Sequence, residues 1–345
     1  MRQETAQKGR RMAHAFSEFI KIIGKGKKGS RSLTREEARD AMAMVLDGEV
    51  TGEQRGAFLM LLRTREETPE EITGFLQACR ERIPPALTTL PVTLDIGCYA
   101  GKRRQLPWYL LAVAVLARAG HRVLLHGAHE PGSGRLYASH VLPALGLDPV
   151  QTVAEAGEQL QQMGVSYLDL GIILPPLDEI IKLREWFGLR SCANTLARLL
   201  NPSQAGYAVQ GVYHMHLDHK HCRVNEQFPE FDALCFRGDG GDPEVNGERP
   251  TELFITRQAT TVTTELPALA PRWALKDKTM RVEDLLSYWR GESEHAYGEY
   301  AVTGTLASLL MLAENLPVNE AVLQAQSLWK TRNSECLPFS SLSKL

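Results

Sequence analysis

Two loops of this 345-residue chain combine glycine with basic residues, a composition that could bind phosphate groups. Residues 97–101 read GCYAG and lead directly into the three cations of 102–104. Residues 127–135 contain three glycines, follow His126 and end at Arg135. Small residues let backbone N–H groups approach an anion, and a helix starting near Arg135 would add the positive end of its dipole. The alternative is that each glycine loop is an ordinary turn.

Three carboxylates could hold a metal ion beside such a phosphate site. Asp239, Asp242 and Glu244 follow a predicted strand at 233–236, and Asp and Glu oxygens are the ligands that Mg²⁺ prefers. Aspartate and glycine are also the commonest turn formers, so a plain turn is the alternative here too.

A histidine-rich string at 214–219, reading HMHLDH, resembles the dinuclear-metal loop of the metallo-β-lactamase superfamily. A metal hydrolase acting through His214 and His216 is therefore a remote alternative. That family needs further ligands downstream, and after His221 the sequence offers only His295 as another histidine.

The loops must be positioned by a sheet. Strand patterns at 91–96 and 121–127 flank an apolar helical run at 110–119. A strand–helix–strand unit of this kind predicts a parallel sheet covered by helices, in which both glycine loops open at the same edge. Further strands are predicted at 167–174, 207–213, 233–236 and 253–256, with helices at 136–145, 153–163, 177–187 and over most of the chain from 282.

The first part of the chain is predicted to be helical. Thr34, Thr51 and Thr68 each precede Glu or Gln by three residues, the spacing of a capping box. No strand pattern interrupts 16–83, and the prolines at 84–85 form a natural joint. We therefore expect a small helical domain before the α/β domain.

The composition of the chain indicates which class of partner and which cellular compartment to expect. Charged residues make up 23% of the chain and the net charge is -2, but nine basic residues face two acidic ones through Ser32. A basic arm indicates an acidic partner such as nucleic acid, and a solvated tail is the alternative. Six scattered cysteines without a C-x-x-C pair fit a reducing cytosol, and no apolar run reaches the roughly 20 residues of a membrane span. We expect a cytoplasmic protein without a membrane partner.

The helical strings resemble the anthranilate phosphoribosyltransferase family (glycosyltransferase family 3), especially LTREEA at 33–38, GAFLMLLR at 56–63 and ETPEE at 67–71. The resemblance implies an α/β fold of the nucleoside phosphorylase/phosphoribosyltransferase type, with a small N-terminal helical domain and a larger domain built on a mostly parallel central sheet. It implies a basic arm at 1–15, the helical domain at 16–85 and the α/β domain at 86–345, with some helices of 151–187 packing on the helical domain. It also implies a homodimer through the helical domains and phosphoribosyl pyrophosphate bound between domains.

The chain departs from the family at the substrate motifs. The family's G-T-G-G-D corresponds to residues 97–101, its K-H-G-N-R to 125–129, and its adjacent Asp-Glu metal pair to Asp242 and Glu244, one residue further apart. Phosphoryl-type substrates depend on such positioning and on metal charge. We therefore expect no catalytic residues and no cofactor, the alternative being Mg²⁺ on Asp242 and Glu244 with phosphoribosyl pyrophosphate.

The altered motifs resemble the YbiB-like branch of the family, whose members bind nucleic acid without marked sequence preference. This implies a non-sequence-specific binder of single- or double-stranded nucleic acid through Lys25, Lys27, Lys28, Arg31, Lys102, Arg103, Arg104 and Arg135. Tyr99 and Trp108 could stack on unpaired bases, although Trp108 also fits a core position.

The former phosphate and acceptor site would be vestigial, and the resemblance assigns to it Gly97, Gly101, His126, Gly127, Arg184 and Asn194. Arg184 and Asn194 match family positions near the acceptor. They keep open the alternative of a phosphoribosyl or other glycosyl transferase with a changed acceptor.

Overall fold

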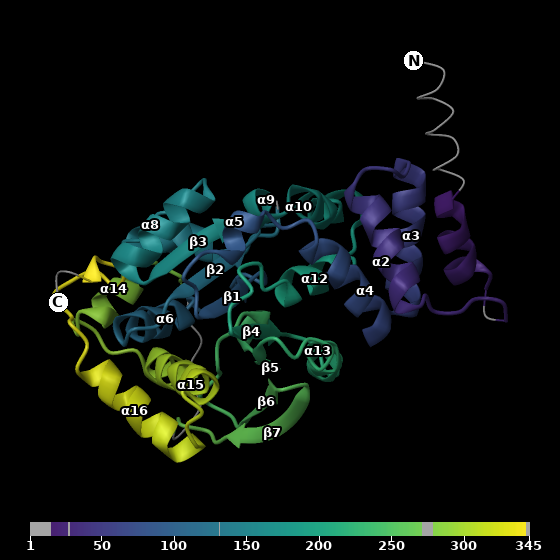
Figure 1. The fold of residues 1–345 in the computed structure, drawn as a ribbon. Coiled ribbons are helices and arrows are strands. Elements are labelled where there is room, and N and C mark those ends of the chain that lie inside the picture. Colours follow the sequence, from purple (N-terminus) through teal and green to yellow (C-terminus); the bar gives the residue numbers. More distant parts are fainter. Residues whose placement is uncertain (1–14, 27, 131, 271–278, 343–345) are drawn as a thin grey trace. The chain divides into compact units, whose positions relative to one another are not determined.

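The computed structural model describes residues 15–26, 28–130, 132–270 and 279–342. The chain forms two compact units (Figure 1). The helical unit comprises the chain up to Ile83 together with Leu174–Leu200, and the α/β unit comprises Pro84–Ile173 and Asn201–Leu345. The α/β domain expected at 86–345 is thus interrupted by residues 174–200, which belong to the helical unit. The sequence had predicted such helices only within 151–187.

The helical unit is built from short helices with well-defined starts. After a helical segment at 15–24 it contains α2 (Arg35–Leu46), α3 (Gly52–Arg65), α4 (Pro69–Arg80), α10 (Pro175–Lys182), α11 (Arg184–Phe187) and α12 (Ala193–Leu199). All three predicted capping boxes are present, with the threonine hydroxyl accepting from the third residue on. Helices α2 and α4 pack closely, since a Cβ at Gly74 would lie 2.2 Å from the carbonyl oxygen of Arg35. Phe16, Phe58 and Phe75 meet edge to face in the core.

The α/β unit contains a seven-stranded sheet in the order β3-β2-β1-β4-β5-β6-β7. The strands are β1 (Leu94–Cys98), β2 (Val123–Gly127), β3 (Val165–Asp169), β4 (Tyr207–Val212), β5 (Asp232–Arg237), β6 (Thr251–Arg257) and β7 (Thr260–Leu266). The five strands from β3 to β5 are parallel, and β6 and β7 continue the sheet in antiparallel fashion. The predicted mostly parallel sheet is confirmed.

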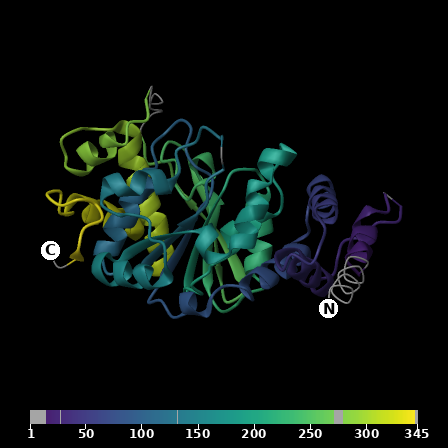
Figure 2. The same cartoon turned by 90° about the horizontal axis from the view of Figure 1, so that it is seen from above.

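Helices cover both faces of this sheet (Figure 2). On one face, α6 (Tyr109–Arg118) and α15 (Ala296–Ala313) pack side by side, with α16 (Val318–Lys330) against both. Residues alternate between faces along β5: Leu234 and Phe236 join this main core, whereas Cys235 joins a small cluster under α13 (Leu217–Asn225). The remaining helices are α5 (Pro85–Thr88), α7 (Ala138–Val141), η1 (Leu142–Leu145), α8 (Val153–Met163), α9 (Leu170–Ile173), η2 (Asp239–Gly241) and α14 (Glu283–Trp289).

Strand order reverses between β1 and β4. From β1 the chain builds β2 and β3 on one side and then returns to build β4 and β5 on the other. In open α/β sheets the crevice at such a switch point, outside the carboxyl ends of the strands, is where ligands bind. The loops after β1 and β4 flank this position, so the candidate site is sought there.

Three element predictions from the sequence are corrected. The predicted strand at 167–174 ends at Asp169, where α9 begins. The histidine-rich connection contains the helix α13, and the threonine-rich edge strand β7 was not predicted. Within the residues described, no helix is both long and apolar enough to cross a membrane.

Candidate functional site

The loop after β1 folds inward at the switch point. Tyr99, Ala100, Gly101 and Lys102 are all buried. Lys102 and Leu136 exchange backbone hydrogen bonds at 2.8 and 2.9 Å, which ties this loop to the segment after β2. As a result, this edge of the sheet is closely packed, and the three basic residues at 102–104 lie in different environments.

Lys102 was predicted to bind nucleic-acid phosphates, and its burial contradicts this. Its side chain is 1% exposed, and its ammonium donates to Glu244 Oε1 at 2.7 Å. The same nitrogen lies 3.0 Å from the carbonyl oxygen of Asp239 and 3.2 Å from its Oδ2. A lysine held by two carboxylates and a carbonyl inside the protein has no donor left to offer a phosphate.

Glu244 is a fully buried carboxylate that accepts two further hydrogen bonds. Its Oε1 also accepts from the Tyr297 hydroxyl at 3.0 Å, and its Oε2 accepts from the Tyr109 N–H at 2.9 Å. Tyr109 is the first residue of α6, so the carboxylate stands at the positive end of that helix. Burial raises the pKa of the Glu244 carboxyl to about 7, although the Lys102 ammonium acts in the opposite direction.

The charge of Lys102 is retained in this setting. Burial alone would lower the pKa of its ammonium, but the negative charges of Glu244, Asp239 and Asp242 outweigh burial and raise it. The ammonium therefore acts as the counterion of this carboxylate cluster.

Asp242 also has an internal role. It is buried, and its Oδ1 accepts from the Ala100 N–H at 3.0 Å. The alternative of Mg²⁺ on Asp242 and Glu244 does not fit this arrangement, because a cation already neutralises Glu244. Across the described part of the chain, no group of three or more His, Cys, Asp or Glu side chains is arranged to hold a metal ion.

His126 lies in a buried hydrogen-bonded chain rather than at an open phosphate site. Its Nδ1 is 2.7 Å from the Tyr99 hydroxyl, and its Nε2 is 2.8 Å from Asp95 Oδ1. Asp95 Oδ2 in turn accepts from the Ser203 hydroxyl at 3.4 Å. These hydrogen-bonded side chains link β1, β2 and the segment before β4, and all of them are buried.

The glycines assigned to the predicted vestigial site allow close packing. Gly97 lies within β1, paired between β2 and β4. A Cβ at Gly127 would lie 2.8 Å from the Tyr167 hydroxyl oxygen, and one at Gly101 would lie 2.9 Å from the Tyr137 ring. Gly101 also has a φ of +67°, which favours glycine.

The prediction that Tyr99 and Trp108 stack on unpaired bases is wrong. Tyr99 is 3% exposed and bonded to His126, and Trp108 is fully buried against Tyr288 and His295. Neither ring can reach a base from solvent.

The other predicted cations are more accessible. Arg103 and Arg104 are exposed, and Arg103 Nη2 donates to the Ser133 carbonyl at 3.4 Å. Arg135 is partly buried, and its guanidinium holds the carbonyls of Ala100 and Gly101 at 2.9 and 3.1 Å, so it shapes the loop.

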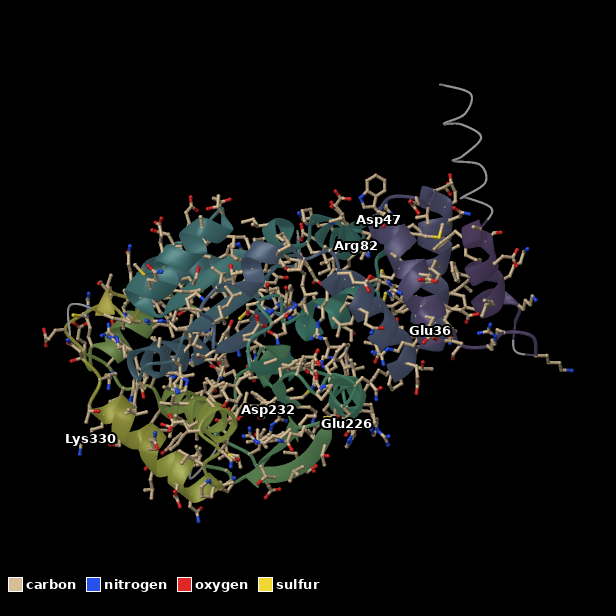
Figure 3. All side chains as sticks on the ribbon, viewed as in Figure 1. Glu36, Asp47, Arg82, Glu226, Asp232 and Lys330 are labelled. Atoms are coloured by element: carbon tan, nitrogen blue, oxygen red, sulfur yellow. The ribbon has the colours of Figure 1, made fainter. Side chains whose placement is uncertain are left out.

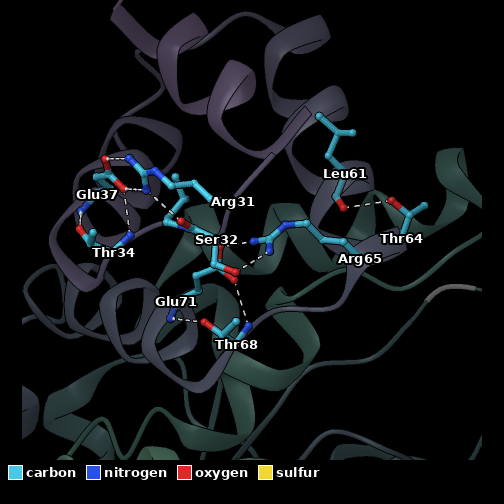
Figure 4. Close-up of polar contacts among 10 residues, drawn as sticks. Arg31, Ser32, Thr34, Glu37, Leu61, Thr64, Arg65, Thr68 and Glu71 are labelled. Atoms are coloured by element: carbon cyan, nitrogen blue, oxygen red, sulfur yellow. Dashed lines mark hydrogen bonds and ion pairs between the residues drawn. The ribbon is translucent and has the colours of Figure 1, made fainter. Parts of the chain in front are cut away.

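In the helical unit, Lys25 and Lys28 are exposed, and Lys27 lies outside the described residues. Arg31 is exposed but forms two hydrogen bonds of 2.6 Å with Glu37, which neutralise its charge (Figure 4). Arg184 and Asn194 also belong to this unit, Asn194 being 6% exposed.

The histidine string does not form a metal centre. Asp218 is buried and accepts from the backbone N–H of His219. His216 and His219 stack at 6.3 Å on the surface, whereas His221 is buried beside Gln210. The described structure therefore gives no support to the metal-hydrolase alternative.

Sequence reasoning missed two features of this edge. Asp239 and Tyr297 join Lys102 and Glu244 across 137 and 53 residues, and no local pattern signals such contacts. Tyr213, 64% exposed directly after β4, was missed because it was treated as the last residue of a strand. Its position before an expected loop was the available signal.

Comparisons with known proteins place this geometry in a family. An anthranilate phosphoribosyltransferase of Methylobacterium nodulans is 33% identical over 245 residues, which is 69% of each chain. The chain belongs to the anthranilate phosphoribosyltransferase-like family. Residues 17–83 match the family model described as the helical bundle domain of a glycosyl transferase family. An uncharacterized Escherichia coli protein, YbiB, is 29% identical over 246 residues, covering 70% of this chain and 76% of its own.

Solved structures of the anthranilate phosphoribosyltransferase family have the same fold. The Thermus thermophilus enzyme aligns with a TM-score of 0.74 at 22% identity, over 89% of this chain and 94% of its own. The Saccharomyces cerevisiae enzyme in complex with phosphoribosyl pyrophosphate and Mg aligns with a TM-score of 0.75 at 18% identity, over 97% and 99%. These identities support the fold alone.

Proposed function

We propose that this chain is a non-sequence-specific nucleic-acid-binding protein on an anthranilate phosphoribosyltransferase-like scaffold. The observation that carries the proposal is the ammonium of Lys102 on Glu244, at a position that resembles the metal pair of the family. A fixed internal cation removes the negative charge on which a magnesium-bound diphosphate depends. The edge is thus unsuited to phosphoribosyl pyrophosphate.

Exposed basic side chains would provide the contacts to nucleic-acid phosphates. Arg103 and Arg104 project from the α/β unit beside the switch point, and Lys25 and Lys28 are exposed on the helical unit. Flexible cations neutralise phosphates without reading bases, so the affinity they provide is independent of sequence and falls with salt. The homodimer through the helical domain and the cytoplasmic location stay predictions.

The test is a salt titration of binding to a labelled single strand of about 20 nucleotides, longer than one typical site. We expect affinity to fall by an order of magnitude or more between about 50 and 200 mM salt. The double variant Arg103→Ala/Arg104→Ala should weaken binding and lower the salt slope by about 2.

The matched control removes two exposed cations elsewhere, Arg290→Ala/Lys330→Ala, at the C-terminal cap of α14 and on α16 (Figure 3 labels Lys330). It should leave the salt slope unchanged. No binding by the wild type at about 50 mM salt, or a slope that does not respond to Arg103 and Arg104, would contradict the proposal.

The alternative is a glycosyl transferase with a changed acceptor. The yeast relative binds phosphoribosyl pyrophosphate and Mg, and Arg184 and Asn194 match family positions near the acceptor. Calorimetry with phosphoribosyl pyrophosphate and magnesium separates the two functions. Micromolar binding would favour the transferase, and we expect no heat of binding.

A further inference from the structure

An exposed aromatic loop follows the central strand β4. Residues 213–216, here called the aromatic loop, read Tyr-His-Met-His, and all four are exposed. Tyr213 and Met215 are 64% and 66% exposed, so large apolar groups face solvent at the carboxyl end of a buried strand. An exposed apolar patch rimmed by polar residues is a mark of an interaction site.

The aromatic loop borders the switch point. A Cβ at Gly241 would lie 3.1 Å from the Cβ of Tyr213 and 3.3 Å from the Cβ of Ala100. The glycine turn therefore lies between the aromatic loop and the loop that continues into Arg103 and Arg104. Because Gly241 carries no side chain, the two loops are brought close together at the edge where ligands of this fold class bind.

The cations around the aromatic loop suit a polyanion. Val212 pairs in register with Arg237 of β5, so the residue before Tyr213 lies beside a cation whose side chain is 42% exposed. Arg237 Nε is 3.8 Å from the buried Asp218, which orients the guanidinium while leaving it partly in solvent. Together with the exposed Arg103 and Arg104, which follow β1, it places positive charge at the ends of the strands on either side of β4.

The aromatic loop has a defined shape. The rings of Tyr213 and His214 meet edge to face, with centroids 5.2 Å apart and planes at 86°. His216 turns the chain into α13 with a φ of +66°, a conformation that costs a non-glycine residue about 1 kcal/mol. Such conformations persist where surrounding structure determines them, and they cluster at binding sites.

We propose that Tyr213, assisted by His214 and Met215, stacks on unpaired bases of a single strand whose phosphates lie on the neighbouring arginines. The inference rests on the proposed function and specifies its ligand as single-stranded rather than duplex. Every base has a π-face, so stacking adds affinity without sequence preference, whereas a duplex keeps its base faces covered. The phenol and imidazole provide the aromatic surface, and the thioether of Met215 adds a soft apolar contact.

The experiment compares two probes of equal length and charge, a labelled oligo(dT) and the corresponding abasic phosphodiester. The wild type should bind oligo(dT) at least about fivefold more tightly, the effect of one stacked base. Tyr213→Ala and Tyr213→Leu should abolish this preference without changing the salt slope, and Tyr213→Phe should keep it. Leucine retains apolar bulk without a π-face, so this pair separates stacking from hydrophobic contact.

Leu323→Ala, which removes a 67% exposed apolar side chain on α16, serves as the remote control and should behave as the wild type. Equal binding of the two probes by the wild type, or a preference that survives in Tyr213→Leu, would overturn the stacking role. In both cases oligo(dT) still binds, whereas failure of the proposed function means that neither probe binds. A change in molecular mass of Tyr213→Ala in light scattering, with the base preference intact, would assign the aromatic loop to self-association and overturn the inference.

Discussion

Among the described residues, each unit contains one completely buried glutamate, Glu71 or Glu244, and the two carboxylates are neutralised in different ways. Glu71 in the helical unit is the third residue of a capping box. Its Oε2 accepts from the Thr68 N–H at 2.9 Å, while its Oε1 accepts from the Leu33 N–H at 2.8 Å and contacts the Arg65 guanidinium (Figure 4). Glu244 in the α/β unit is held by Lys102, Tyr109 and Tyr297, which lie between 53 and 142 residues away.

The difference lies in how far each arrangement depends on the tertiary fold. Glu71 is partly satisfied within one helical turn, and the side chain of its arginine partner is still 22% exposed. Glu244 has a lysine partner that is 1% exposed and reaches it only when the segments that follow β1 and β5 come together across the end of β4. A buried ion pair that is broken leaves an uncompensated charge, so the more deeply buried pair should be the more sensitive one.

The largest effect is expected from Lys102→Met, which removes the ammonium but keeps the apolar bulk. It should lower the free energy of unfolding by about 3–5 kcal/mol, because the Glu244 carboxylate remains buried without its cation. Arg65→Met should cost less, since Glu71 keeps two backbone donors. The measurement is urea unfolding followed by tryptophan fluorescence. Arg104→Met, an exposed neighbour, is the control and should stay within about 0.5 kcal/mol. An equal loss in Lys102→Met and Arg65→Met would remove the contrast between the two units.

The pH dependence of the same variant sharpens the comparison. The folded-state pKa of Glu244 is already raised to about 7, and loss of Lys102 raises it further. A carboxyl with a raised folded-state pKa binds its proton more tightly when folded, so its contribution to stability is lost as pH rises through that pKa. The stability gap between the wild type and Lys102→Met should therefore widen from about pH 6 to pH 9, by at most about 1.4 kcal/mol per pH unit. The double variant Lys102→Met/Glu244→Gln should show no such widening.

The smallest effect is expected in the helical unit, where Glu71 is held partly by contacts within its own capping box. Thr68→Ala removes the hydroxyl that accepts from the Glu71 N–H at 3.2 Å and should cost about 1 kcal/mol. Thr64→Ala, within α3, is the matched control and should be nearly neutral or slightly stabilising, because alanine favours helix. Both changes are read from thermal unfolding by circular dichroism. A loss at Thr68 as large as that at Lys102 would mean that the two buried carboxylates depend equally on single partners.

Local chemistry explains which predictions from the sequence succeeded. The capping boxes at Thr34, Thr51 and Thr68 involve residues three apart, so their spacing alone identifies them. The string at 102–104 reads as three equal cations, and only strand packing separates the buried Lys102 from the exposed Arg103. Strand β7 was missed because its residues are mostly polar and exposed, which leaves no apolar alternation to detect.

The tethering of the Lys102 ammonium has a consequence for how the protein responds to its surroundings. A dissociable counterion stabilises a fold by an amount that grows with the logarithm of its concentration. A charge covalently attached to the chain, as on the Lys102 side chain, has no such dependence, since supply and chelation in the medium do not reach it. The carboxyl edge of this sheet therefore keeps the same counterion whether divalent ions are abundant or scarce.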